Sequence, residues 1–232
     1  MRRQRGGARA FFLSSILLKS FPYIGSVMTR ILILGASGFI GGQTLQRWLA
    51  ERSDYELWAV DIQPTPPNAA CAALQERYRC LDSHAPDFAP ILQLAPFDVC
   101  LNCMGAAHVA NSFAQPAFDY RLNVDLLARL LEAMRLYAPN CRLVQLSSAA
   151  VYGEARSIPV SENAPLQPLS PYGFHKKMAE DLCRLYQRCY SLPTCSLRIF
   201  SAYGEGLQKQ IFWDIAQKAR ENSDHIELWG TG

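Results

Sequence analysis

A glycine-rich turn directly follows the first apolar run of the chain, and it constrains the fold more than any other feature. The run is Ile31-Leu32-Ile33-Leu34 and the turn is Gly35-Ala36-Ser37-Gly38-Phe39-Ile40-Gly41. In a strand–turn–helix unit, Gly35 permits a tight turn, Gly38 lets backbone N–H groups approach a pyrophosphate, and Gly41 lets the helix pack on the strand. The helix N-terminus then favours phosphate charge. The turn therefore predicts a dinucleotide site.

A carboxylate, Asp61, ends the second predicted strand, twenty residues after Gly41. At this place a carboxylate accepts hydrogen bonds from the ribose 2′-hydroxyl of adenosine and repels a 2′-phosphate. No arginine lies at positions 62–64, so the sequence predicts NAD rather than NADP. An ordinary loop carboxylate is the alternative for Asp61.

Apolar runs of strand type alternate with helical patterns from Arg30 onward. The predicted strands are Arg30–Leu34, Glu56–Val60, Tyr78–Leu81, Asp98–Cys103, Arg142–Ser147 and Thr194–Phe200. The predicted helices are Phe39–Glu51, Phe113–Tyr137, Tyr172–Tyr190 and Ile211–Asn222. Nearly continuous apolar strands are typical of sheets covered on both faces. The alternation predicts an α/β fold with a doubly wound parallel sheet, the Rossmann architecture.

Three residues far downstream of the turn could transfer a proton: Ser148, Tyr172 and Lys176. Tyr172 and Lys176 are four apart on a predicted helix, so their side chains share one face. The ammonium, aided by a positive nicotinamide ring, is expected to lower the pKa of Tyr172 so that it can act as a base. Lys176 would also hold the nicotinamide ribose, and Ser148 would hydrogen-bond the reacting oxygen. With the glycine turn, these residues predict hydride chemistry on an alcohol or ketone; a chance Y-x-x-x-K and a strand-capping serine are the alternative.

The charge of the chain is unevenly placed. Its 232 residues, half of them apolar, suffice for one large α/β domain with a substantial core, or for one domain and part of another. Six of the 23 basic residues and none of the 20 acidic ones lie in residues 1–30, so the remainder carries a net charge of −3 against +3 overall. The body has no basic stripe, and no nucleic-acid partner is expected.

Residues 1–27 combine several arginines with a short apolar stretch, Ala10–Leu18. The stretch is too short to span a bilayer, and no membrane partner is expected. A targeting peptide is one explanation of this N-terminal extension. A translation start placed too early is favoured, because Met28 directly precedes the first strand. The extension is therefore expected to lie outside the fold.

Eight cysteines lack the spacing of a disulfide scaffold, which favours a reducing, cytoplasmic compartment. Cys100-Leu101-Asn102-Cys103 is formally C-x-x-C, but it lies on a predicted buried strand without a second Cys or His pair. The four histidines form no ligand pattern and are interpreted as structural or solvated. Core packing is favoured over a metal site, and no metal is expected.

Further motifs resemble the NAD-dependent epimerase/dehydratase family of extended short-chain dehydrogenases/reductases, as does the G-x-x-G-x-x-G spacing. The motifs are Leu81-Asp82, Asn102 to Ala107, Asn123-Val124, Leu146 to Gly153 and Pro171 to Lys176. In the family, the second residue of the first motif contacts adenine, and the second motif lies along the cofactor. The resemblance implies a set of NAD-binding residues: Gly35, Ser37, Gly38, Phe39, Ile40, Gly41, Asp61, Asp82, Cys103, Met104, Asn123 and Lys176.

The residues after Ser148 narrow the reaction that the resemblance implies. Sugar dehydratases of the family carry Asp-Glu there, whereas this chain has Ala149-Ala150, which cannot transfer protons. The pattern is most similar to epimerases that oxidise and re-reduce a nucleotide-sugar, here expected at C4 of a UDP-sugar, through a keto intermediate. A net sugar reductase or dehydrogenase and a non-catalytic dinucleotide-binding protein remain open. Family members also suggest a homodimer through the two long helices.

The resemblance also divides the chain. Residues 28–200 are expected to form the NAD-binding domain, and 201–232 only the beginning of a C-terminal substrate domain. Ser201 stands where the family often has an asparagine that contacts substrate phosphates. The chain is thus expected to be truncated, to keep an NAD pocket, and to bind a nucleotide-sugar poorly.

Overall fold

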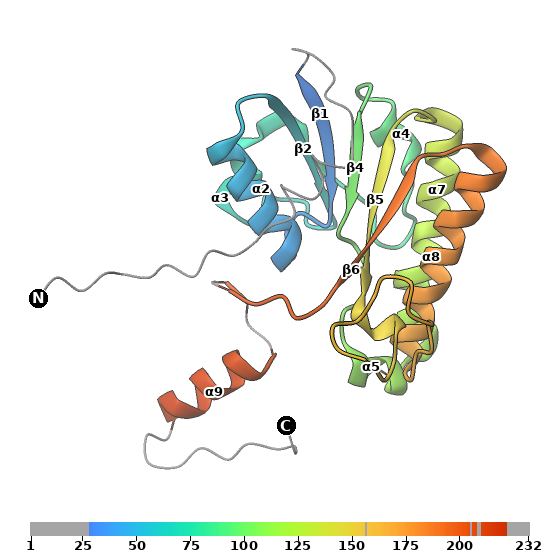
Figure 1. Ribbon diagram of the computed structural model, residues 1–232. Coiled ribbons are helices and arrows are strands. Elements are labelled where there is room, and N and C mark those ends of the chain that lie inside the picture. Colours follow the sequence, from blue (N-terminus) through green and yellow to red (C-terminus); the bar gives the residue numbers. More distant parts are fainter. Residues whose placement is uncertain (1–27, 156, 205, 208–209, 222–232) are drawn as a thin grey trace, which may run out of the picture.

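A single parallel sheet organises the computed structural model, which describes residues 28–155, 157–204, 206–207 and 210–221 (Figure 1). The strands in these residues are β1 (Thr29–Leu34), β2 (Tyr55–Asp61), β3 (Tyr78–Cys80), β4 (Val99–Asn102), β5 (Arg142–Ser148) and β6 (Thr194–Ile199). Their order is β3-β2-β1-β4-β5-β6, and every neighbouring pair is parallel. The predicted doubly wound α/β fold is confirmed. The strand order reverses between β1 and β4, which is where such sheets open a crevice for a ligand.

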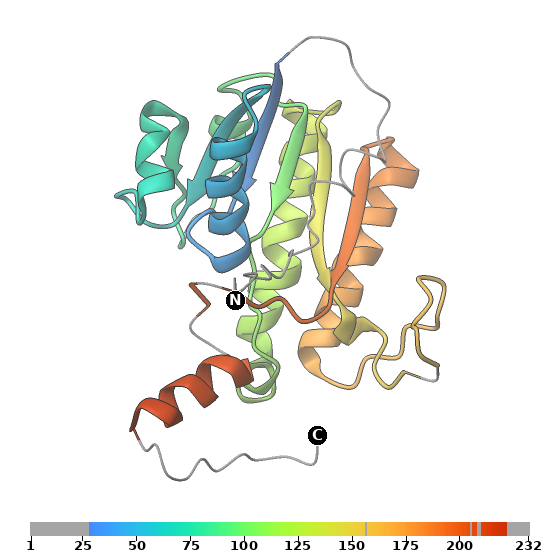
Figure 2. The same cartoon turned by 60° about the vertical axis from the view of Figure 1, so that its left-hand side comes forward.

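Helices cover both faces of the sheet. The helices in the described residues are α2 (Phe39–Glu51), α3 (Ala69–Ala73), α4 (Ala89–Leu92), α5 (Val109–Ala114), α6 (Pro116–Tyr120), α7 (Leu126–Tyr137), α8 (Pro171–Tyr190) and α9 (Gln210–Glu221), of which α9 lies apart from the sheet. Figures 1 and 2 show α2 and α3 on one face, and α4, α7 and α8 on the other. No helix in the described ranges is both long and apolar enough to cross a membrane.

Alternate residues of β1 pack into two separate hydrophobic cores, one on each face of the sheet. Ile31 and Ile33 pack in the cluster with α2 and α3, whereas Leu32 and Leu34 pack in the cluster with α4, α7 and α8. Successive side chains of a strand point to opposite faces, so a strand covered on both sides must be apolar throughout. This explains why the apolar runs of the sequence located the strands.

The long helix predicted over Phe113–Tyr137 is wrong as a single element. Gln115 leaves helical geometry, with φ −138° and ψ 66°, and Pro116 starts a new helix. A π-helical turn, Arg121–Asp125, then leads into α7. Proline is tolerated at the first helical position because its missing N–H has no partner there anyway. The leucine spacing that predicted one helix continues across these breaks. The short helices α3 and α4 were not predicted.

The predicted division of the chain remains a prediction. Residues 1–27 lie outside the described residues. A 3₁₀ turn, Ala149–Val151, ends β5, and the segment after β6 runs along the carboxyl edge of the sheet towards α9 (Figure 2).

The buried face of α7 offers a test of the core. Leu131 is fully buried between the sheet and α8, whereas Leu136 on the same helix is exposed. We expect Leu131→Ala to lower the free energy of unfolding by about 2–5 kcal/mol, because it removes apolar burial and leaves a cavity. Leu136→Ala should change it by less than about 0.5 kcal/mol. Urea denaturation of both variants measures the difference, and equal losses would contradict the described packing.

Candidate active site

The glycine turn joins β1 to α2 at the carboxyl edge of the sheet. Gly35 has φ +76°, and a Cβ there would lie 3.0 Å from backbone atoms of Cys103 and Met104. A Cβ on Gly41 would overlap the Gly35 carbonyl. Gly38 caps α2 without a side-chain hydrogen bond, and the first turn of this helix carries no acidic residue. The helix therefore presents backbone N–H groups, the donors that phosphate oxygens accept from.

Asp61 lies beside this turn at the end of β2 and is buried. Its Oδ2 accepts a hydrogen bond from the Ser37 N–H at 2.7 Å, and its Oδ1 accepts one from the Ile62 N–H at 2.8 Å. The carboxylate thus holds the glycine turn in place, a role that the sequence did not indicate. Each oxygen keeps further lone-pair capacity for a ribose hydroxyl.

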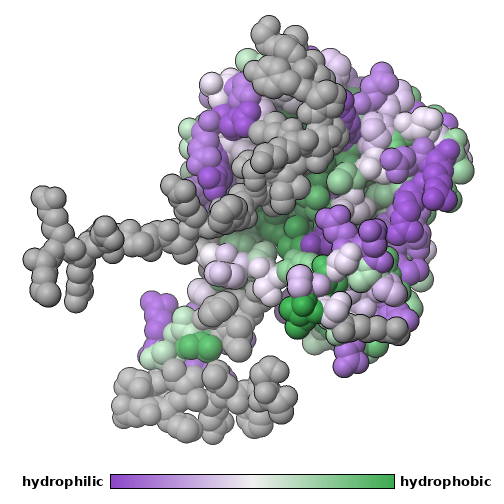
Figure 3. Space-filling view, in the orientation of Figure 1, coloured by the Kyte–Doolittle hydropathy of each residue, from purple (hydrophilic) through white to green (hydrophobic). Residues whose placement is uncertain are grey.

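A cavity of about 300 Å³ lies between the glycine turn, the end of β4, the end of β5 and α8. The predicted site residues on its wall are Gly38, Phe39, Ile40, Gly41, Cys103, Met104, Ser148, Tyr172 and Lys176. Phe200, Ala202 and Leu207 close another side, and Phe200 is exposed. Figure 3 shows hydrophobic surface in the hollow below the sheet. The structure therefore brings the two halves of the predicted site to one cavity, as hydride and proton transfer at one carbon require.

Burial controls the two titratable groups of α8 that face this cavity. Burial raises the pKa of Tyr172, while a hydrogen bond with Ser148 acts in the opposite direction. Burial lowers the pKa of Lys176 to about 8. The Lys176 Nζ lies 5.8 Å from the centre of the Tyr172 ring and donates to the Leu146 carbonyl at 3.1 Å. Among the protein groups desolvation is the largest cause, and the net pKa of Tyr172 is raised. The expectation that the ammonium and a nicotinamide ring together lower the pKa of Tyr172 remains a prediction.

Asn123 is buried in the π-helical turn, and neither its Oδ1 nor its Nδ2 has a hydrogen-bond partner. A Cβ on Gly105 would lie 2.6 Å from this Oδ1 and 3.5 Å from the Lys176 Nζ. Buried polar atoms normally have partners. An unpartnered amide, a glycine that leaves room beside it and a helix N-terminus without a cap all fit a bound dinucleotide.

Asp82 is exposed and follows β3, the outermost strand, away from the cavity wall. Its carboxylate accepts a hydrogen bond from the His84 N–H at 2.8 Å, and backbone hydrogen bonds of this kind lower the pKa of Asp82. Its predicted contact with adenine remains a prediction. No group of three His, Cys, Asp or Glu side chains that could hold a metal occurs in the described part of the chain.

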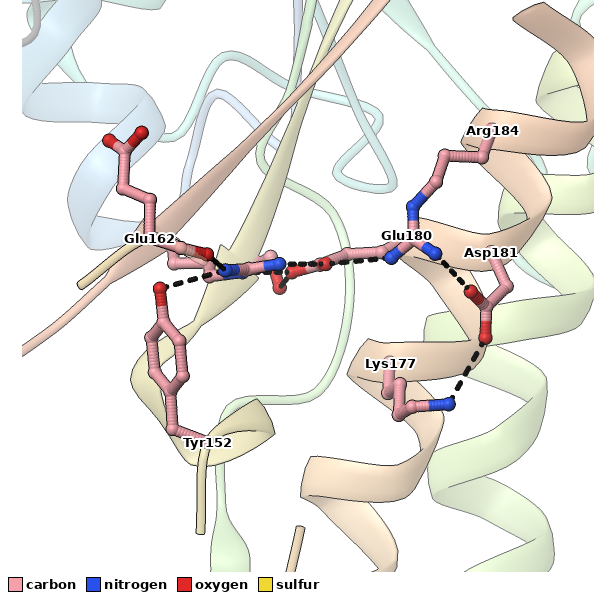
Figure 4. Close-up of polar contacts among 8 residues, drawn as sticks. Tyr152, Glu162, Lys177, Glu180, Asp181 and Arg184 are labelled. Carbon is pink, nitrogen blue, oxygen red and sulfur yellow. Dashed lines mark hydrogen bonds and ion pairs between the residues drawn. The ribbon is translucent and has the colours of Figure 1, made fainter. Parts of the chain in front are cut away.

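An ion-paired network beside Ser148 was not found from the sequence (Figure 4). Glu180 of α8 is buried, and Arg198 of β6 donates to both of its carboxylate oxygens at 2.8 and 2.9 Å. Ser147 donates to the same carboxylate at 2.6 Å. Arg198 also donates to the Tyr152 hydroxyl at 2.7 Å and the Glu162 carbonyl at 2.8 Å. The network therefore fixes the end of β5 against α8 and β6.

A second set of buried polar contacts joins α8 to α5 and α6. The Tyr172 N–H donates to the Ser112 Oγ at 3.1 Å, and the His175 Nδ1 lies 2.6 Å from the Asp119 Oδ2. The sequence carried a signal for the α8 residues of these contacts. Polar side chains stand at helical spacing on the face of α8 that bears Lys176, where apolar residues are expected.

Such a cavity defines a class of protein, one that binds a dinucleotide and moves a proton beside it. Residues 31–232 match the model of the NAD dependent epimerase/dehydratase family, and the chain belongs to that family. The resemblance seen in the sequence is thereby confirmed, and the cofactor of the family is NAD.

Individual relatives are nucleotide-sugar epimerases. The chain is 33% identical over 212 residues to a Bacillus subtilis protein named "Uncharacterized UDP-glucose epimerase YtcB", covering 88% of this chain and 66% of that one. It is 29% identical over 175 residues to the UDP-glucose 4-epimerase of Streptococcus mutans, covering 75% and 52%. The structure is similar to that of the Bacillus cereus UDP-glucuronic acid 4-epimerase in complex with UDP-glucuronic acid and NAD, with a TM-score of 0.71, 28% identity, and coverage of 83% and 63%. The chain thus spans about half to two thirds of these relatives.

The network around Arg198 predicts how the free energy of unfolding depends on pH. We expect Arg198→Met to lower the free energy of unfolding by about 3–5 kcal/mol near pH 7, because it leaves the buried Glu180 carboxylate with Ser147 and only a longer contact, 3.4 Å, to the cation of Arg184. In the wild type, burial raises the pKa of Glu180, but hydrogen bonds with Arg198 and Ser147 outweigh it and the net pKa is lowered. This carboxylate therefore stabilises the fold above its unfolded-state pKa, and the contribution is lost as pH falls through the lower folded value. Without Arg198 burial dominates, Glu180 protonates more readily, and the difference between variant and wild type should narrow at acidic pH.

Urea denaturation between about pH 4 and pH 7 measures this difference, across the range in which carboxylates titrate. Lys177→Met is the matched control, because Lys177 pairs with Asp181 on the exposed side of the same helix (Figure 4). Exposed pairs contribute at most about 1 kcal/mol. A loss at Arg198 as small as that at Lys177, or one independent of pH, would contradict the network.

Proposed function

We propose that the protein is a UDP-sugar 4-epimerase and that this chain supplies its NAD-binding and proton-transfer part. The observation that carries the proposal is the single cavity that holds the glycine turn together with Ser148, Tyr172 and Lys176. The relatives with UDP-sugar 4-epimerase names support the reaction class.

The predicted residues divide by the part of NAD that each would hold. The N–H groups around Gly38 would bind the pyrophosphate, Asp61 the adenosine ribose, and Asp82 the adenine. The backbone at Cys103 and Met104 would lie along the cofactor. Asn123 and Lys176 would bind at the nicotinamide end, where their side chains lie around Gly105. Ser37, Phe39, Ile40 and the glycines Gly35 and Gly41 complete the turn.

Proton transfer would be carried out by Ser148, Tyr172 and Lys176, which line the cavity opposite the glycine turn. When bound, NAD would supply reversible hydride transfer at the sugar carbon, so that oxidation and re-reduction leave the cofactor unchanged overall. Tyr172 would take the proton of the sugar hydroxyl and give it back, with Ser148 bonded to the reacting oxygen. Two positive charges, the Lys176 ammonium and the oxidised nicotinamide ring, would offset the burial that raises the pKa of Tyr172. The protein groups leave the pKa of Tyr172 raised, so the oxidised cofactor would be the group that helps the phenol to lose its proton.

The turn after Ser148 argues against elimination of water. Ala149 and Ala150 begin the 3₁₀ turn, and the Ala150 N–H donates to the Ser148 Oγ at 3.2 Å. Elimination needs an acid and a base at the sugar carbons. Methyl groups at these two positions can supply neither, which favours epimerisation over dehydration.

The remaining predictions about partners belong to the same proposal. A nucleotide-sugar is the substrate, and the segment from residue 201 would begin the part that covers it. Exposed apolar side chains on α7 and α8 support a homodimer through these helices: Leu136, Tyr137, Leu185 and Tyr190. Eight free thiols support a reducing, cytoplasmic compartment.

Replacing the base tests the reaction directly. We expect Tyr172→Phe to lower turnover by about 10²–10⁴-fold, the range for losing a general acid–base group, while NAD binding changes little. UDP-glucose or UDP-glucuronic acid is incubated with each protein, product sugars are separated by chromatography, and NAD binding is followed by fluorescence titration. Tyr55→Phe, at the start of β2 and away from the cavity wall, is the control.

Two results would reject the proposal. Undiminished turnover in Tyr172→Phe would remove the assigned base. Stoichiometric accumulation of NADH with substrate would indicate a net dehydrogenase, because an epimerase leaves the cofactor oxidised overall.

Asp61 tests the cofactor preference. Asp61→Asn keeps a side-chain oxygen for the Ser37 N–H but removes the negative charge. We expect NAD to bind roughly tenfold more weakly, since one charge-assisted hydrogen bond is worth about 1.5 kcal/mol. The preference for NAD over NADP should shrink, because repulsion of the 2′-phosphate is lost. The dissociation constants of NAD and NADP are measured for the wild type and the variant. An unchanged ratio of the two constants would mean that Asp61 only stabilises the glycine turn.

A further inference from the structure

A buried acid–histidine pair lies beneath the active site, between α6 and α8. The His175 Nδ1 and the Asp119 Oδ2 are 2.6 Å apart, and the two side chains are 11% and 4% exposed. The Tyr120 ring meets the His175 ring edge to face, with centroids 5.5 Å apart. A charge-assisted contact shielded from water constrains geometry strongly. The pair therefore fixes α8 against α6.

The two partners stand next to the residues that would bind the nicotinamide end. Asp119 precedes Asn123 by one helical turn, and His175 lies between Tyr172 and Lys176. Because Asn123 and Lys176 both lie around Gly105, any shift of α8 along α6 would separate them. The Ser112 Oγ, which accepts from the Tyr172 N–H, adds a second tie in the same place.

Asp119 also acts on the reacting pair through its charge. Burial lowers the pKa of Lys176 to about 8, and the Asp119 carboxylate raises it. Burial raises the pKa of Tyr172, and Asp119 raises it further. The other titratable group that acts on Lys176 is the Cys103 thiol after β4.

We propose that Asp119 and His175 are positioning residues for the reaction. Through His175, Asp119 sets where Tyr172 and Lys176 stand, and its charge keeps the lysine protonated in a buried place. Neither residue lines the cavity. The proposal rests on the function proposed above, because it gives the pair a part in that reaction.

Neutralising the acid separates charge from packing. Asp119→Asn keeps an oxygen for His175 but removes the charge. We expect the titration midpoint of Tyr172 to fall by about one pH unit, as for the removal of a neighbouring like charge. The midpoint is measured as phenolate absorbance, taken as the difference from the same protein carrying Tyr172→Phe. Asp181→Asn, which removes an exposed carboxylate on α8, should leave it unchanged. An unmoved midpoint in a cooperatively folded Asp119→Asn would overturn the charge role.

Removing the histidine tests the anchor. His175→Ala should raise the NAD dissociation constant about tenfold, the size of one lost positioning contact. His175→Asn should restore most of the affinity, because its amide can donate from nearly the position of Nδ1. Equally weakened NAD binding in both variants, or unchanged binding in both, would overturn the anchoring role. If Asp119→Asn does not fold, the two His175 variants still test the proposal.

These measurements do not depend on turnover. A wild-type protein with a complete substrate-binding part that binds NAD but interconverts no UDP-sugar would overturn the proposed function. The titration and binding results would then still show whether Asp119 and His175 control Tyr172 and Lys176.

Discussion

The contact between the carboxyl ends of β1 and β4 is the constraint on which the site depends. At these ends the Cys103 N–H donates to the Leu34 carbonyl at 2.9 Å, and the Gly35 N–H donates at the same distance to the Val60 carbonyl of the neighbouring β2. Beyond these bonds the chain turns towards one face after β1, whereas the segment after β4 leads to the helices of the other face (Figure 1). A crevice must open where the connections diverge. The glycine turn borders it from one half of the sheet, and Ser148, Tyr172 and Lys176 border it from the other.

Much of this arrangement could be predicted, because a sheet buried on both sides leaves a simple pattern. Each strand was located to within one residue at either end. Turn glycines and a Y-x-x-x-K pair also follow local patterns, so several residues that line the cavity could be picked out without coordinates. The break at Gln115 and Pro116 could not. A proline that opens a new helix and a π-helical turn that adds a residue leave apolar spacing almost unchanged, so periodicity alone does not register them.

The pKa values of the site residues could not be predicted from the sequence. A Tyr and a Lys one helical turn apart suggested an acidified phenol, but both groups are buried, and desolvation sets both pKa values. Burial is a property of the whole fold. The same holds for Arg198, whose partners come from α8, the residues just after β5 and a loop. Glu180 also has a cation four residues later on its own helix, Arg184, so the sequence did not indicate that Arg198 of β6 would be its main partner.

Two oppositely charged side chains on the buried face of α8 differ in how fully their charges are paired. Glu180 is held by both arms of Arg198 and by Ser147, and its pKa is lowered despite burial. Lys176, one turn earlier, donates to a backbone carbonyl, and its pKa falls to about 8. Within the described residues, Asp119 supports it through space while bonded to His175 instead. A charge that only maintains the fold gains from full pairing, since a stranded one is costly. An ammonium kept buried and incompletely neutralised gains nothing for stability, and such groups concentrate where a ligand completes the pairing. The imbalance between neighbouring charges thus supports the proposal that the reactive end of the cofactor binds at Lys176, on grounds separate from similarity to other proteins.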